Sequence, residues 1–196
     1  MDRKNIPIVI TGILALFFFF SGCGAYNGFV NQEVSVEEAW AKVQSAYQRR
    51  ADLIPNLVNT VKGVADYEKG TLEAVTKARA SATGVTLSAD DLTPGKIQQF
   101  QEAQSQLSGA LSRLLVSVEK YPELKAASSF QELQVQLEGT ENRIKVERDR
   151  FNEVVADYNR SVRRFPGVIF AGLFGFERKG MFEAESGADK APEVKF

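Results

Sequence analysis

Apolar residues recur with helical spacing along the first half of the chain. From Ser35 to about Ala80 the one break signal is Pro55, and between Val36 and Val64 the apolar positions follow three- and four-residue steps with the same phase on both sides of Pro55. Two independent helices would have no reason to share a phase, so we favour one long helix kinked at Pro55, which cannot donate to the Ala51 carbonyl. The alternative is a helix that ends near Asp52 and another that starts at Pro55. The repeat consists of Val36, Trp40, Val43, Tyr47, Ile54, Leu57, Val61 and Val64.

A loop and a second helical pattern follow. Residues 81–93 are rich in Ser, Thr, Gly and Asp and have no helical period. Thr93 and Pro94 are the residue types of an N-cap and a first helical position. Apolar positions then continue with helical spacing, and we expect this helix to end near Tyr121, because the next residue is Pro.

A third long helical pattern covers residues 130–162. Ser129 and Glu132 have the spacing of a capping box ahead of it, and Phe165-Pro166 stops it. No strand-like alternation occurs in the body of the chain. The sequence therefore predicts an all-α fold, an elongated antiparallel bundle of three to four long helices behind an N-terminal membrane anchor.

The first segment, residues 1–24, has the form of a membrane-targeting segment. Arg3 and Lys4 precede an apolar run that extends to Phe20, and small residues follow the run. The run is short for a spanning helix, which needs about 20 apolar residues, but it reaches that length if the helix continues toward Phe29. The positive charges before the run predict that the bulk of the chain lies outside the cytoplasm.

Two interpretations of this segment are open. In the first, Ser21-Gly22-Cys23 is a lipobox, and cleavage before Cys23 leaves a lipid-modified cysteine as the membrane attachment. Phe20 stands where that motif usually has Leu. In the second, the segment is retained as a single-pass anchor.

Two C-terminal segments differ from the helical body, residues 25–166. Residues 167–182 crowd large apolar side chains between glycines, in a stretch too short and too broken to span a bilayer. This segment either packs on the end of the bundle or contacts a membrane surface or a partner. Residues 183–196 mix Glu, Gly, Ala, Asp, Lys and Pro, which is typical of a flexible tail.

The composition removes several kinds of chemistry. The 196 residues include one Cys and no His, which excludes Ser-His-Asp and Cys-His nucleophiles and a zinc site made of the usual ligands. The formal net charge of −1 argues against a dedicated nucleic-acid binder. No phosphate-binding loop or nucleophile motif is present. We therefore expect no enzyme, no metal and no cofactor.

Polar residues gather around the Pro55 kink. Arg50 occupies a position of the apolar seam, and a buried Arg must be paired because its desolvation is costly. Glu147 lies on the seam of the third helix, and Glu119 and Glu141 are other candidate partners. We favour an internal polar network that fixes the register of the bundle; the alternative is a polar pocket that binds a ligand. The candidate residues are Arg49, Arg50, Asp52, Pro55, Asn56, Glu119, Glu141, Asn142 and Glu147.

Several ordered stretches of the chain resemble the LemA family. They are Tyr26-Asn27, RRADLIPNLV at 49–58, EKYPELKA at 119–126, LEGTENRI at 137–144, Tyr158-Asn159 and RRFP at 163–166. The resemblance implies a bacterial, membrane-anchored, mostly α-helical protein with its helical domain outside the cytoplasm and no established enzymatic activity. Similar proteins often have His where this chain has Tyr67, so a role proposed for that His cannot apply here.

The anchor, the long helices and the missing catalytic groups together predict a scaffold or adaptor of the cell envelope. It would present its helix faces or its Phe-rich end, residues 167–182, to another envelope protein. The alternative is a binding module for a lipid or another small amphiphile, held in a polar pocket near Pro55.

Overall fold

The computed structural model describes residues 6–63 and 69–184, and this part of the chain consists of helices and loops without a strand. The predicted all-α class is confirmed. Val64, Tyr67 and residues 185–196 of the expected tail lie outside the described residues. The elements are α1 (Ile6–Lys62), α2 (Lys69–Gly84), the short 3-10 helix η1 (Ala89–Asp91), α3 (Pro94–Val118), α4 (Pro122–Ala126), α5 (Ser128–Arg163) and α6 (Gly167–Phe174).

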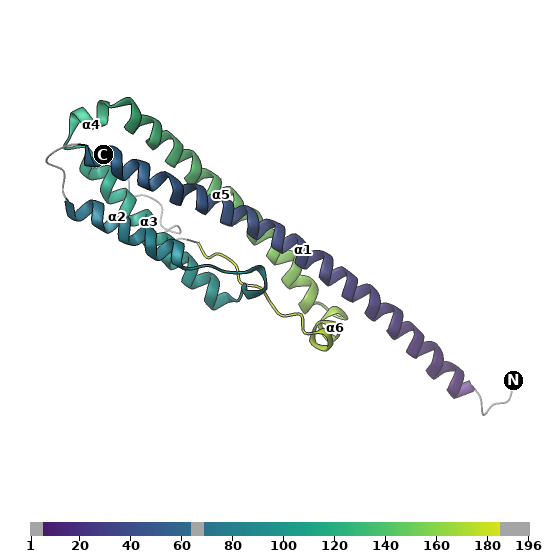
Figure 1. Ribbon diagram of the computed structural model, residues 1–196. Coiled ribbons are helices and arrows are strands. Elements are labelled where there is room, and N and C mark those ends of the chain that lie inside the picture. Colours follow the sequence, from purple (N-terminus) through teal and green to yellow (C-terminus); the bar gives the residue numbers. More distant parts are fainter. Residues whose placement is uncertain (1–5, 64–68, 185–196) are drawn as a thin grey trace, which may run out of the picture.

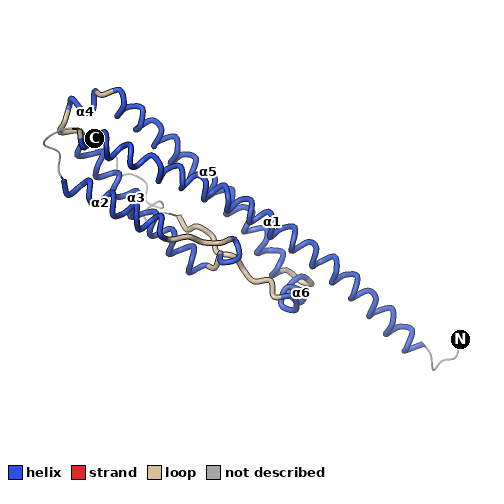
Figure 2. The backbone as a smooth tube through the Cα atoms, viewed as in Figure 1, coloured by secondary structure: helices blue, strands red, loops and turns tan. Residues whose placement is uncertain are grey.

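The helix α1 is the axis of the molecule. Its 57 residues correspond to about 85 Å at the usual helical rise. Figure 1 shows its C-terminal half packed lengthwise with α2, α3 and α5, while its N-terminal part projects beyond the bundle. The short α6 lies beside α1 near the point where α1 leaves the bundle. Figure 2 shows the tan connections between helices and the extended segment that follows α6.

The apolar seam predicted on α1 is buried in two clusters. The anchor-side core surrounds Trp40, which is 1 % exposed and meets the rings of Phe100 and Phe151 at 5.3 and 5.4 Å. The distal core contains Leu57 on α1 with partners on α2, α3, α4 and α5. Each fully buried large apolar side chain stabilises the fold by about 1.5–3 kcal/mol. Together the two cores contain the buried apolar residues of α1, α2, α3 and α5.

The predicted single helix from Ser35 to Ala80 is wrong at both ends. It starts earlier, because α1 runs without a break from Ile6 through the apolar segment into the bundle. It also ends earlier, at Lys62, and α2 begins at Lys69 and returns alongside the bundle. The shared phase across Pro55 was informative, since Pro55 lies inside α1. The apolar face of α2 packs on α3, which a straight continuation of α1 beyond Lys62 would not allow.

The predicted helix ends are correct in part. Thr93 is the N-cap residue of α3 and Pro94 its first residue, but the Thr93 side chain makes no capping hydrogen bond. The capping box at Ser129 is wrong: α5 begins at Ser128, because the unpredicted turn α4 feeds directly into it. The Ala127 carbonyl accepts hydrogen bonds from the Phe130 and Gln131 amides instead. The helix α5 ends at Arg163, just before Phe165-Pro166, as predicted.

Candidate functional site

The buried guanidinium of Arg50 is the centre of a polar layer across the bundle. Arg50 is 2 % exposed and lies on α1 between the two cores. Its Nη1 donates to both carboxylate oxygens of Glu141 on α5 at 3.0 Å and to Ser108 Oγ on α3 at 2.7 Å. Its Nη2 donates to Gln104 Oε1 on α3 at 2.7 Å. Hydrogen bonds to a charged group are stronger than neutral ones, so this layer offsets the desolvation of the guanidinium.

The layer also includes α2. Gln104 Nε2 donates to the Ala82 carbonyl at 3.3 Å, and Arg79 Nε donates to the Ala51 carbonyl at 2.8 Å. The Ala51 carbonyl is the one that Pro55 leaves without its helical donor. All four long helices are therefore joined at one level by directional bonds, which a purely apolar core would not supply. We therefore expect this layer to help set the register of the bundle.

Of the predicted site residues, Arg50 and Glu141 are brought into direct contact. Glu119 does not reach Arg50, because it lies beyond the end of α3 and accepts from Lys125. Glu147 is buried at 3 % exposure, and its carboxylate accepts from Arg143 one turn away on the same helix at 2.8 Å. The other candidates have exposed side chains outside the layer: Arg49, Asp52, Pro55, Asn56 and Asn142.

The cavity beside the polar layer is small. It has a volume of about 100 Å³ and lies between α1, α2 and α3, next to Tyr47 and Gln104. A site for a drug-sized ligand needs about 300 Å³ or more. This cavity has room for a few water molecules and not for a lipid, so it gives no support to an amphiphile site beside Pro55.

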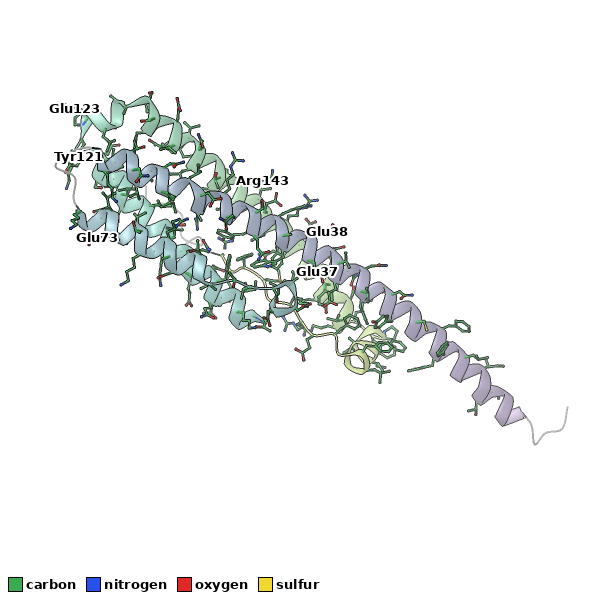
Figure 3. The ribbon with its side chains drawn as sticks, in the orientation of Figure 1. Glu37, Glu38, Glu73, Tyr121, Glu123 and Arg143 are labelled. Carbon is green, nitrogen blue, oxygen red and sulfur yellow. The ribbon has the colours of Figure 1, made fainter. Side chains whose placement is uncertain are left out.

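The exposed Arg49 lies in a wider surface groove between α1 and α5. This α1–α5 groove has a volume of about 640 Å³ and carries three basic residues, Lys42, Arg49 and Arg143. Figure 3 shows Arg143 on α5. Between the basic residues the groove is lined by small or exposed residues: Ser45, Ala46, Val135, Gln136, Gly139 and Thr140.

The way in which the chain after α6 is held to the bundle was not predicted from the sequence. Three side-chain amides each make two hydrogen bonds with the main chain of one residue in that extended segment: Asn159 with Lys179, Asn152 with Phe182 and Gln101 with Glu183. The Phe182 ring enters the anchor-side core, 5.5 Å from the Phe151 ring. The signal in the sequence was the presence of Asn152 and Asn159 on α5.

The same segment closes a buried charged cluster. Lys179 Nζ pairs with Glu33 on α1 at 2.8 Å, and both side chains are largely covered. Tyr158, next to this pair, has no exposed surface and its hydroxyl has no partner within the described structure. Burial, together with the charges of Glu33 and Glu177, raises the pKa of Tyr158 to about 12. The phenol therefore stays neutral and structural at physiological pH.

An apolar groove lies where α1 leaves the bundle. It has a volume of about 820 Å³ and is formed by α1 on one side and α6 on the other. Cys23 is exposed in it. Phe18 and Phe170 are in contact across the two helices, with ring centroids 5.1 Å apart. Among the described helices, α1 is the one with the length and composition to cross a membrane, a test that a signal sequence also passes.

The sequence profile of the LemA family matches residues 39–196, which is most of the chain. The chain belongs to the LemA family. The resemblance stated from the sequence is therefore confirmed. A relative named Protein LemA, from Metamycoplasma hominis, is 23 % identical over 133 residues. That match covers 64 % of this chain and 57 % of the relative, so it spans little more than half of the relative's length. Both the polar layer and the α1–α5 groove lie within the region that matches the family.

Proposed function

We propose that this LemA-family protein is a membrane-anchored helical scaffold whose bundle stands outside the cytoplasm. The observation that supports it best is the continuity of α1 from the apolar segment to Lys62. The same helix that could cross a membrane supplies the buried seam of both cores. A rigid connection of this kind holds the bundle at a fixed distance from the bilayer. The positive residues before the segment favour a cytoplasmic N-terminus.

The packing of α6 favours a retained anchor over cleavage before Cys23. Phe18 contacts Phe170, and a side-chain carbon added to Gly22 would lie 3.2 Å from the same ring. Cleavage at a lipobox would remove both residues and expose Phe170, which is 3 % exposed when they are present. If the anchor is retained, Cys23 is an unmodified side chain whose exposed thiol faces the apolar groove.

The α1–α5 groove is the surface that best fits a protein partner. Gly139 lies in the interior of α5, where a glycine destabilises a helix by about 1 kcal/mol relative to Ala. No atom outside its own helical surroundings lies within 4 Å of the position its Cβ would take, so the fold itself does not require a glycine there. The glycine leaves room for close approach from outside. With Lys42, Arg49 and Arg143 around it and Val135 67 % exposed, the groove suits a segment with acidic and apolar side chains.

Photo-crosslinking in cells tests the scaffold directly. A photo-reactive amino acid at Gln136, in the groove, should yield a specific crosslinked protein in the membrane fraction. A second substitution, Gly139→Phe, fills the groove and should abolish that product, while Gly139→Ala should retain it. A photo-reactive residue at Val116, exposed on α3, serves as the control position. A crosslinked product that persists unchanged in Gly139→Phe would contradict the assignment of this groove.

A further inference from the structure

We propose that α6 and the facing part of α1 lie within the lipid leaflet on the bundle's side of the membrane, with acyl chains covering the apolar groove between them. The inference rests on the membrane anchor of the proposed function and is independent of the protein partner. In this placement α6 is surrounded by phospholipid, with anionic headgroups at its edges.

The composition of α6 is the first argument. Its eight residues, GVIFAGLF, include no polar side chain. One face is covered, since Phe170 and Ala171 are each 3 % exposed. The other face is open, with Ile169 46 % and Leu173 70 % exposed. A helix that is apolar on all sides is stable where all sides meet apolar surroundings. The protein supplies these surroundings on one side only.

The position of α6 along α1 is the second argument. From Ile6 to Tyr26 the helix α1 extends about 30 Å, the thickness of a bilayer's hydrocarbon core. The helix α6 contacts the second half of this length: Phe170 lies against Phe18, and the Phe174 ring lies 5.2 Å from the Tyr26 ring. Tyr at the end of a span is typical of the membrane interface. If α1 spans the bilayer, α6 is placed at the depth of the adjoining leaflet.

The surface around α6 is the third argument. The open face of α6 lines the groove together with Phe19, a side chain of the span that is itself 65 % exposed. A solvent that covers this part of the span also covers α6 and the groove. Exposed basic residues flank α6 in the sequence, with Arg163 and Arg164 before it and Arg178 after it. Basic residues next to an apolar segment attract anionic lipid headgroups.

Quenching by brominated lipids tests this placement in the full chain. Leu173→Trp is the test variant, Phe20→Trp the control for the span and Val116→Trp the control for the distal end of the bundle. All three carry Cys23→Ala, so that no acyl chain on Cys23 can occupy the groove. The proteins are reconstituted into phosphatidylcholine–phosphatidylglycerol vesicles with or without brominated acyl chains. The native Trp40 is 1 % exposed and lies about 21 Å beyond Tyr26 along α1, so it adds the same unquenched background to each.

We expect Leu173→Trp to lose a fraction of its added emission comparable to that of Phe20→Trp, and Val116→Trp to lose none. Quenching of Phe20→Trp without quenching of Leu173→Trp overturns the placement of α6 and leaves the anchor intact; a face reserved for solvent or for a partner protein gives this result. If Phe20→Trp is not quenched either, the anchor of the proposed function fails as well.

A second arm tests the headgroups. Only the phosphatidylglycerol or only the phosphatidylcholine is brominated, at equal amounts of both lipids. We expect stronger quenching of Leu173→Trp by the brominated phosphatidylglycerol, with an enrichment of no more than about fivefold per arginine. The preference should weaken in Arg163→Gln/Arg164→Gln, in which Arg178 remains. Equal quenching by the two lipids in the parent variant overturns the headgroup assignment.

Discussion

Arg79 Nε on α2 donates a hydrogen bond of 2.8 Å to the carbonyl oxygen of Ala51 on α1. Four residues after Ala51 the chain has Pro55, which has no amide hydrogen, so the carbonyl has lost its donor within α1. The interhelical bond replaces the intrahelical one. The carbonyl that Pro55 leaves without a donor thus becomes a point of contact between α1 and α2, at the level of the Arg50 layer.

Arg79→Ala should lower the free energy of unfolding by about 1–2 kcal/mol, because it leaves a buried carbonyl without a donor. In a Pro55→Ala background an amide is available within α1, so the same substitution should cost about 1 kcal/mol less. Denaturant unfolding of the four proteins in detergent measures this coupling. Equal costs in the two backgrounds would show that Arg79 does not compensate for Pro55.

The Arg50–Glu141 pair should make a measurable contribution even though Glu141 is half exposed. Glu141→Ala removes the only carboxylate on the buried guanidinium within the described structure, and we expect a loss of about 2 kcal/mol. Glu138→Ala, an exposed carboxylate one turn away on α5, should change the stability by less than about 0.5 kcal/mol. Similar values for the two variants would contradict the role of the polar layer.

Stability should fall at alkaline pH through Tyr158. The pKa of this phenol is raised from 10.0 to about 12 in the folded protein, chiefly by burial. The neutral form is therefore favoured in the folded state, and a stabilisation of roughly 3 kcal/mol, present below pH 10, is lost as the pH rises through 12. Tyr158→Phe keeps the ring, and its unfolding free energy should fall less between pH 9 and 12. Tyr121→Phe provides the matched loss of one phenol. A parallel pH dependence of all three proteins would refute the assignment.

Cys23→Ala should leave the protein in the membrane fraction, because the proposal attributes attachment to the span of α1. Metabolic labelling with a fatty acid should give the same low signal for the parent and the variant. Labelling of the parent that is lost in Cys23→Ala, together with release of the variant from the membrane, would restore the lipoprotein interpretation.

The sequence predicted the seams well and the connections poorly. The period of Trp40, Tyr47 and Ile54 is set by burial, and burial is what the structure shows. A seam position also identified Arg50 as a residue in need of a partner. The choice of Glu141 over Glu119 could not be predicted, because it depends on where α3 ends relative to α5.

The role of Arg79 was not predictable for a similar reason. Pro55 indicates that the Ala51 carbonyl has no donor within α1. The donor that replaces it, Arg79, lies on α2, and the sequence did not predict that α2 packs back against α1. The contacts of the segment after α6 could not be predicted from the sequence either. Asn152 and Asn159 hydrogen-bond its main chain, and contacts to main chain leave no pattern in the side chains of the bound segment.

We propose that α1 holds the bundle outside the cytoplasm, and the accessibility of one cysteine tests this most directly. Val116→Cys, in a Cys23→Ala background, places a single exposed thiol at the distal end of the bundle. Labelling of intact spheroplasts with a membrane-impermeant maleimide measures its location. We expect full labelling before lysis. Labelling that occurs only after lysis would contradict it.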